Sequence, residues 1–458
     1  MIQENILQSI ERFIEDNRDL MVNRCKELVA IPSMTEDREQ VSLALDYVLD
    51  LGLRMGLRTK ALLHGEIGLV EVGEGEEILG VLAHVDVVDP GDESKWISPP
   101  FEPEIREGKL YGRGTLDDKG AVIAVMTAME ALVKLGIPLN KEIQLILGTR
   151  EETHWTDMEA YVEKFPLPDY GFTPDGSFPI CNVEKGGMDL ELIIPLEKGK
   201  PQGKKAVLES VEAGKAVNVV PGECQTVLKM PDGTIKKLET KGRSVHSCQP
   251  EKGINALVEM GKQIRSMLES GILEPTKGAE FLAMLGDRFE STEGETLGLY
   301  SETEYYQGEF VHRNVFSPTL AYTSGREIHV NINVRFPYGS DEEKIRETFR
   351  NLAAQFGGRM EEKGYMPAVY VRKDRPFLKA FDEAYERVMG ESGGYNLEYG
   401  GTYAKAIPDV VSWGPIFPGE EDTCHEENEY IGVDSLVKNA KIFALAMANI
   451  ALTEESFR

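Results

Sequence analysis

Apolar and polar residues follow two different periods along this chain. In the first half, the apolar runs at 78–88 and 142–152 are short and continuous, which is typical of strands buried on both faces of a parallel sheet. Between them, residues 120–136 carry apolar side chains at helical spacing, and Gly136 and Pro138 end this helix. Alternating strands and helices predict an α/β fold in which a mostly parallel sheet is flanked by helices.

The pattern changes near residue 187. Residues 188–195 and 328–337 alternate apolar and polar side chains, which is typical of antiparallel strands with one exposed face. Ser340 and Glu343 have the spacing of a capping box and predict that a helix starts there. In the first half, Thr35 is expected to cap the second helix.

The amino-acid composition argues against some classes of binding partner. Among 458 residues, 50 Lys and Arg stand against 78 Asp and Glu, which gives a net charge of −28. An acidic surface disfavours nucleic acid and anionic membranes, so we expect neither as a partner. Five scattered cysteines without a CxxC pair, and no apolar run of the signal-peptide type, predict a cytoplasmic protein without a disulfide framework.

Acidic residues and histidines stand where the predicted strands end. The donors are His84 and Asp86 after the first strand, Glu151 and Glu152 after the second, Asp175 in TPDG, Asp117 in GRGTLDDKG at 112–120, and His425. Taken alone, each has an ordinary explanation, since a strand-end histidine is usually structural and adjacent glutamates are usually exposed acids. In an open α/β sheet, however, ligands bind beyond the carboxyl ends of the strands, so the set predicts one site.

These donors predict two divalent metal ions. His84 and His425 can each bind one ion, and Asp117 can bridge both, since paired ions lie about 3.5–4 Å apart. Asp175 and Glu152 then complete one ion each. Nitrogen and oxygen donors suit Zn²⁺, which we expect, with Mn²⁺ and Co²⁺ as alternatives.

Two further carboxylates are expected to assist the ligands. Glu151 lies beside a ligand and can act as the general base and acid that moves a proton from water. Asp86 follows His84 by two residues and can accept the second ring N–H of that histidine, which would fix its orientation.

The domain organisation follows from the positions of the ligands. Asp175 and His425 are 250 residues apart, yet both are needed at one site. The chain must therefore leave the first domain, build another and return. We predict a metal-binding catalytic domain from residues 1–186 and 373–458, and an inserted α+β domain from residues 187–372.

The order of the motifs resembles the dinuclear metallopeptidase family that contains aminoacylases, carboxypeptidase G-type enzymes and carnosine-type dipeptidases. The resemblance extends over essentially the whole chain and is greatest to the bacterial dipeptidase V branch. It rests on HVDVV, GRGTLDDKG, TREET, TPDGSFP, AVNVVP, GRSVHSCQP, NVRFP, GGTYAKAIP and DTCHEENE. Two departures from the family pattern are Asp89 before Pro90 and the sequence SVHSCQP, in which Cys248 is expected to be a small packing residue.

The resemblance implies the same metal ligands and adds residues from the inserted domain, which would be a lid. It implies that His246 stabilises the oxyanion, while Asn218 and Arg335 hold the substrate. It also implies that the peptide bond between Asp117 and Asp118 is cis. Residues that would line the pocket are Gly401, Thr402 and Tyr403.

The function that this resemblance implies is metal-dependent hydrolysis of dipeptides with a free C-terminal carboxylate. The planar guanidinium of Arg335 suits such a carboxylate because it can pair with both oxygens. An N-acyl amino acid amidohydrolase is the main alternative, and a catalytically silent binding protein of the same fold is a second. The size of the insertion resembles single-chain forms, so we expect a monomer that acts on small peptides.

Overall fold

The structure is a computed structural model that describes residues 4–197, 205–300, 305–398 and 400–458. It divides into two compact units: Met1–Val183 with Val369–Arg458, called the first unit, and Glu184–Ala368, called the second unit. The boundaries between the two domains that the sequence predicts, at residues 187 and 373, lie within a few residues of these positions. The second unit is thus inserted into the first along the chain.

A nine-stranded sheet forms the centre of the first unit. Its order is β1, β2, β6, β3, β7, β21, β9 and β19, with β20 paired to β9. The central strands β6, β3, β7 and β21 run parallel, whereas the pairs β1–β2, β2–β6 and β21–β9 are antiparallel. The α/β prediction is confirmed, with the parallel part at the centre of the sheet. The bounds are β1 Arg58–Leu62, β2 Ile67–Val72, β3 Ile78–His84, β6 Glu142–Gly148, β7 Tyr170–Thr173, β9 Ile180–Glu184, β19 Val369–Tyr370, β20 Tyr395–Glu398 and β21 Val410–Ser412.

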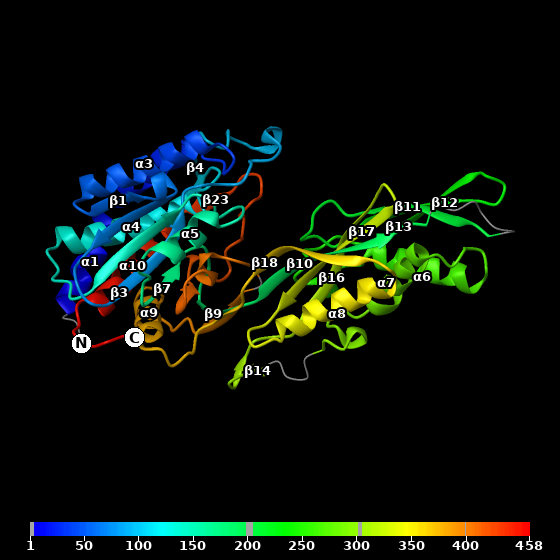
Figure 1. Cartoon of the computed structure of the whole chain (residues 1–458). Helices are drawn as coiled ribbons and strands as arrows, with labels where there is room; N and C mark the ends of the chain where they lie inside the picture. Colours follow the sequence, from blue (N-terminus) through cyan, green and yellow to red (C-terminus); the bar gives the residue numbers. More distant parts are fainter. Residues whose placement is uncertain (1–3, 198–204, 301–304, 399) are drawn as a thin grey trace. The chain divides into compact units, whose positions relative to one another are not determined.

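Helices cover both faces of this sheet (Figure 1). Val81 and Leu145 belong to a core shared with α4 and α10, whereas Leu82 and Ile146 belong to a core shared with α5 and η5. Successive side chains of a strand point to opposite faces, so burial on both faces explains the continuous apolar runs. The bounds are α1 Glu4–Asp16, α2 Arg18–Val29, α3 Arg38–Met55, α4 Lys119–Lys134, α5 Thr156–Lys164, α9 Pro376–Met389, α10 Val433–Ala451, η1 Leu63–Gly65, η2 Glu93–Lys95 and η5 Tyr403–Lys405. Across the described residues, none of the helices combines the length and apolarity needed to cross a bilayer.

Two small sheets complete the first unit. One contains β4 (Glu104–Arg106), β5 (Lys109–Tyr111) and β23 (Tyr430–Gly432), and the other pairs β8 (Gly176–Ser177) with β22 (Pro415–Ile416). In the first of these sheets, β23 pairs antiparallel with β5. The chain that follows His425 therefore runs beside the chain that enters GRGTLDDKG.

Two helix starts differ from the prediction. The carboxylates of Asp37 and Asp341 cap α3 and α8, whereas Thr35 and Ser340 were the predicted caps. The hydroxyl of Thr35 instead donates to Asp86 at 2.7 Å. Asp and Ser are equally good caps, so the local sequence does not choose between neighbouring candidates.

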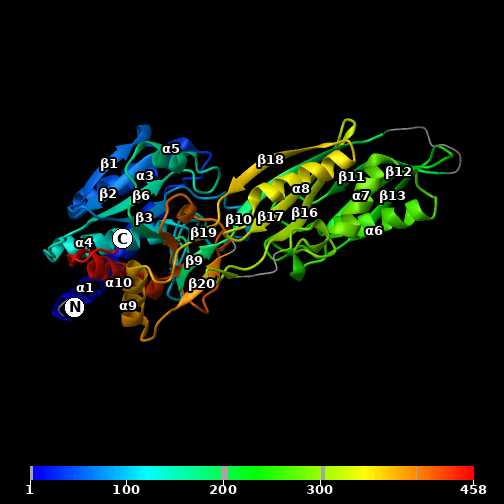
Figure 2. The ribbon, with the colours of Figure 1, turned by 60° about the horizontal axis from the view of Figure 1, so that its bottom comes forward.

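The second unit is an antiparallel sheet with helices packed along it (Figure 2). The strand order is β13, β12, β11, β16, β17, β10 and β18, and the core joins this sheet to α6, α7 and α8. This confirms the α+β prediction. The bounds are β10 Gly186–Pro195, β11 Val207–Ala213, β12 Glu223–Lys229, β13 Ile235–Lys241, β14 Tyr305–Tyr306, β15 Glu309–Phe310, β16 Val315–Ser324, β17 Glu327–Phe336, β18 Arg359–Met366, α6 Ala256–Glu269, α7 Lys277–Arg288, α8 Glu342–Gln355, η3 Pro250–Lys252 and η4 Glu295–Leu297.

Packing of α10 on the central sheet predicts a large loss of stability when Phe443 is truncated. The Phe443 ring is fully buried, with centroids 5.1 Å from Phe172 and 5.8 Å from Trp413. Phe443→Ala should lower the free energy of unfolding by about 3–5 kcal/mol, because lost burial adds to the cost of a cavity. Leu53→Ala on α3, where the side chain is 60% exposed, is the control and should cost less than about 0.5 kcal/mol. Denaturant unfolding followed by circular dichroism compares the two, and equal losses would contradict this packing.

Candidate metal centre

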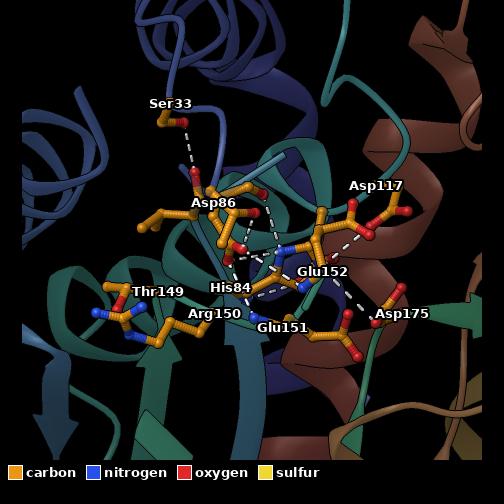
Figure 3. Close-up of polar contacts among 12 residues, drawn as sticks. Ser33, His84, Asp86, Asp117, Thr149, Arg150, Glu151, Glu152 and Asp175 are labelled. Carbon is orange, nitrogen blue, oxygen red and sulfur yellow. Dashed lines mark hydrogen bonds and ion pairs between the residues drawn. The ribbon is translucent and has the colours of Figure 1, made fainter. Parts of the chain in front are cut away.

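Three neighbouring parallel strands bring polar side chains to one edge of the sheet (Figure 3). β3 ends at His84, β6 ends three residues before Glu151, which Glu152 follows, and β7 ends two residues before Asp175. In the register of β3 with β6, His84 pairs with Gly148. Because the three strands are parallel, their carboxyl ends meet at this edge, as the sequence predicts.

Two histidines face opposite oxygens of Asp117. His84 Nε2 lies 3.0 Å from Asp117 Oδ1 and 3.7 Å from Asp175 Oδ2. His425 Nε2 lies 3.0 Å from Asp117 Oδ2 and 3.1 Å from Glu152 Oε2. Asp117 thus presents one oxygen to each imidazole, which is the arrangement expected of a bridging carboxylate.

These separations fit ligand atoms around metal ions. Bonds of about 2.0–2.2 Å place tetrahedral ligand atoms roughly 3.3–3.6 Å apart. The four separations above span 3.0–3.7 Å. Among the described residues, donor atoms within 4.8 Å of one another form two groups: His84 with Asp117 and Glu152, and His84 with Glu151 and Asp175. The donor set therefore fits divalent cations.

The electrostatics of the metal-free site favour the same interpretation. Burial and the charge of Asp117 raise the pKa of Asp175 to about 8. Burial and the charge of Asp175 likewise raise the pKa of Glu151 well above its usual range. Hydrogen bonds with Asp117 and Glu152 raise the pKa of His425 to about 11. The crowded carboxylates thus stabilise bound protons, and divalent cations can supply the same positive charge.

Asp86 contacts several neighbours at once. Its backbone carbonyl lies 3.0 Å from His84 Nδ1, whereas its carboxylate oxygen Oδ1 is 3.5 Å from that nitrogen. The carboxylate accepts hydrogen bonds from the Thr35 hydroxyl and from the backbone N–H groups of Glu151 and Glu152, at 2.7, 3.3 and 3.4 Å. The shorter orienting contact to His84 therefore comes from the main chain of Asp86. Its side chain holds the loop that bears Glu151 and Glu152.

Asp157 and Tyr403 support the same loop. Asp157 Oδ2 accepts the first two backbone N–H groups after β6, at 2.6 and 3.0 Å, and the Tyr403 hydroxyl at 2.9 Å. Tyr403 is fully buried, and its ring lies edge-on to that of His84, 6.4 Å between centroids. Gly401 and Thr402 precede it, and Thr402 caps η5. The predicted place of these three residues in a substrate pocket stays a prediction.

Sequence reasoning missed a buried carboxylate beside Asp117. Glu429, four residues after His425, is fully buried and accepts the backbone N–H of Asp117 at 3.1 Å. The peptide bond between Asp117 and Asp118 is cis, as the resemblance implies. Asp118 in turn accepts the backbone N–H of His84 at 3.2 Å. The location of Glu429 inside DTCHEENE is the signal that the sequence offers for it.

The predicted substrate residues of the inserted domain gather within the second unit. The backbone N–H of Ser247 donates to the carbonyl of Asn218 at 2.9 Å, and Val219 forms an isolated bridge with His246. Arg335 on β17 is 6% exposed, and within the described part of the chain its Nε and Nη1 have no hydrogen-bond partner. Burial, together with the charge of Arg335, lowers the pKa of His246, so these two side chains are close.

The contacts of His246 define where its proton lies. The backbone N–H of Cys248 donates to His246 Nδ1 at 3.2 Å, and Cys248 Sγ lies 2.8 Å from the same nitrogen. A backbone N–H is always a donor, so Nδ1 is an acceptor and Nε2 bears the proton of the neutral ring. Cys248 therefore contacts His246 directly, beyond the packing role expected from the sequence.

Metal titration tests the centre. We expect two equivalents of Zn²⁺ to bind each chain and to stabilise it, since a ligand at 100 Kd adds about 2.7 kcal/mol. Asp117→Asn should lose both equivalents because both ions would share this ligand. Asp92→Asn, an exposed loop position, is the control and should keep both. Equilibrium dialysis with metal analysis measures the stoichiometry. An Asp117→Asn protein that keeps both equivalents would contradict the bridging role.

The same titration has a defined pH dependence. Because the pKa of Asp175 in the metal-free site is about 8, this carboxyl is protonated at neutral pH. Metal binding must displace that proton, so the affinity should rise as the pH increases through about 6 to 8. An affinity that falls over this range would contradict Asp175 as a ligand.

Comparison with known proteins identifies relatives of this chain. The description "Peptidase family M20/M25/M40" matches residues 80–449. The chain is 33% identical over 473 residues to "Putative dipeptidase YtjP" of Bacillus subtilis (strain 168), a match that covers 97% of this chain and 98% of that protein.

Solved structures share the fold at low sequence identity. Human carnosine dipeptidase 1 aligns with a TM-score of 0.63 at 17% identity, over 97% of this chain and 98% of that chain. The Bacillus subtilis YXEP protein, a dinuclear metal binding peptidase from the M20 family, aligns with a TM-score of 0.52 at 13% identity, over 95% and 98%. These likenesses show the fold alone, whereas the family match spans most of the sequence. The chain belongs to peptidase family M20/M25/M40.

Proposed function

We propose that this protein is a metal-dependent dipeptidase that hydrolyses dipeptides with a free C-terminal carboxylate. The observation that supports this most strongly is the bridging geometry of Asp117, whose two oxygens each lie 3.0 Å from a different histidine, His84 or His425. Membership of a peptidase family and 33% identity to "Putative dipeptidase YtjP" support the reaction class.

Two divalent ions fit the donors, and we propose Zn²⁺, with Mn²⁺ and Co²⁺ as alternatives. His84, Asp117 and Asp175 would hold one ion. Asp117, Glu152 and His425 would hold the other. Such ions, when bound, polarise a carbonyl and lower the pKa of water.

Glu151 has the environment of a general base and acid. Its side chain is largely buried, and in the described residues its Oε1 has no hydrogen-bond partner. Its main chain is fixed, because the backbone N–H donates to Asp86 and the carbonyl accepts the Trp155 indole N–H at 2.6 Å. Donor atoms of His84 and Asp175 lie within 4.8 Å of its carboxylate. We therefore propose that Glu151 takes a proton from the attacking water and returns it to the leaving amine.

Arg335 suits the C-terminal carboxylate of the substrate. In the described residues, Nε and Nη1 of this buried guanidinium have no hydrogen-bond partner, which is costly until an anion pairs with the group. A carboxylate can pair with one edge of a guanidinium through two parallel hydrogen bonds. His246, with its proton on Nε2, is proposed to donate to the developing oxyanion, and Asn218 to help hold the substrate.

An N-acyl amino acid amidohydrolase is the second candidate. Arg335 would bind the carboxylate of such a substrate equally well, and the residues described above do not distinguish a free amine from an acyl group. A catalytically silent binding protein is disfavoured because the complete ligand set is accompanied by Glu151, which a binding protein does not need.

We further propose that the chain acts as a monomer in the cytoplasm, on small peptides and without nucleic acid or membrane partners. The net charge of −28 supports the absence of nucleic-acid and anionic membrane partners, because both are polyanions and would be repelled. The cysteine pattern supports a reducing compartment.

A substrate panel with Glu151→Gln tests the reaction. The metal-loaded protein should release amino acids from dipeptides, and less from tripeptides or N-acetyl amino acids. Glu151→Gln should lower kcat by about 10²–10⁴-fold while keeping two metal equivalents, because it removes proton transfer but no ligand. Preference for N-acetyl substrates would favour the amidohydrolase, and unchanged turnover in Glu151→Gln would contradict its role.

Arg335→Met tests carboxylate recognition. The variant should lower kcat/KM for a dipeptide by about 30–100-fold, since a charge-assisted pair contributes about 2–3 kcal/mol. The matched substrate is the dipeptide amide, which lacks the carboxylate and should be cleaved equally by both proteins. An equal loss on both substrates would indicate damage to the fold instead of lost recognition.

A further inference from the structure

Glu429 has no place among the ligands, the general base or the substrate residues proposed above, yet its carboxylate accepts hydrogen bonds from four donors beside Asp117. We propose that Glu429 is a positioning residue for the shared ligand Asp117. It holds the main chain of residues 114–117 so that both carboxylate oxygens of Asp117 face the metal pair. This inference rests on the proposed metal centre and deepens it.

The two oxygens of Glu429 accept hydrogen bonds from the loop that bears Asp117. Oε1 accepts the backbone N–H groups of Leu116 at 2.8 Å and Asp117 at 3.1 Å. The N–H of Gly114 lies 3.0 Å from each oxygen. Oε2 accepts Arg113 Nη1 at 2.6 Å. Three of these donors are main-chain groups, so the carboxylate fixes the backbone of the loop and not only a side chain.

The loop needs an acceptor at this position. Glu429 and Arg113 are both buried, and successive backbone N–H groups that converge on one point form a concave anion site. Gly114 adopts a φ of 87°, which glycine tolerates without strain and which allows its N–H to join the others. Without the carboxylate, three buried N–H groups would lack a partner, and the loop would relax toward other conformations.

Glu429 also joins the two chain segments that supply ligands to the second ion. It follows His425 by four residues and directly precedes β23, which pairs with β5 just before the Asp117 loop. The backbone N–H of Gly112 donates to the Glu429 carbonyl at 3.0 Å. A shift of Glu429 would therefore move Asp117 relative to His425.

The alternative is that Arg113 and Glu429 form an ordinary buried ion pair that stabilises the fold only. The first unit contains a suitable comparison in Arg24 and Glu130, 2.6 Å apart, with Glu130 6% exposed. This second pair joins α2 to α4 and holds no ligand loop. Neutralising either glutamate leaves an arginine without its full partner, Arg113 being buried and the side chain of Arg24 13% exposed. The two variants therefore share the cost of a broken ion pair.

The experiment compares Glu429→Gln with Glu130→Gln in the full chain. Glutamine keeps the volume but offers one acceptor oxygen in place of two, and its amide hydrogens oppose Arg113 or the loop N–H groups. We expect Glu429→Gln to weaken both Zn²⁺ equivalents by about 10–100-fold in competition with a chromophoric chelator. It should also shift the visible spectrum of the Co²⁺-loaded protein. Glu130→Gln also breaks an ion pair and should lower thermal stability, yet keep the wild-type affinity and spectrum.

Each outcome decides between the two roles. Equal metal affinity and equal spectra in the two variants would overturn the positioning role and leave a structural ion pair. A wild-type chain that binds no metal pair would instead contradict the proposed function, so the two failures are distinguishable. Should Glu429→Gln not fold, Glu429→Asp replaces it: the charge opposite Arg113 is kept, but the shorter side chain cannot reach every N–H. The same loss of affinity is then expected, and unchanged affinity would overturn the inference.

Discussion

Repulsion among buried carboxylates is the constraint on which the first unit depends. The parallel order β6–β3–β7 brings Glu151, Glu152 and Asp175 to one edge, where they meet Asp117. In water these groups would separate. Here the sheet register and the loops hold them together. Their proximity disfavours the charged form of each carboxylate, which is why the pKa of Asp175 is raised to about 8. Positive charge is needed at the centre, which explains why the donor set suits cations.

A second row of carboxylates makes this arrangement rigid. Asp86 accepts the N–H groups of Glu151 and Glu152, Asp157 accepts those that directly follow β6, and Glu429 accepts those of the Asp117 loop. Each therefore replaces water as the acceptor for a loop that would otherwise be mobile at a sheet edge. Backbone N–H groups favour the ionised form of each acceptor, whereas burial raises the pKa of Asp157 and Glu429. The loops that bear the proposed metal ligands are thus held in place by buried carboxylates.

The second unit has the opposite character where its predicted substrate residues gather. Arg335 is buried with two nitrogens lacking partners in the described residues, and burial lowers the pKa of Lys185 to about 8. The Arg335 guanidinium would be stabilised by an anion, and a carboxylate such as the C-terminus of a dipeptide is an anion of this kind.

The sequence by itself determined the chemistry and the order of the elements. Apolar runs fixed the strands that end at His84 and before Glu151, because burial on both faces requires unbroken apolar residues. The motifs then supplied the proposed ligand set. Local sequence failed where neighbours offer equivalent groups, as at Thr35 and Asp37, since either side chain can cap a helix. Only the tertiary structure decided the roles of Glu429, Asp157 and Thr35. Glu429 acts on a loop more than 300 residues away, Thr35 contacts Asp86 51 residues away, and Asp157 joins its own neighbouring loop to Tyr403, 246 residues away. Hydrogen bonds of that range leave no periodic signal in the chain.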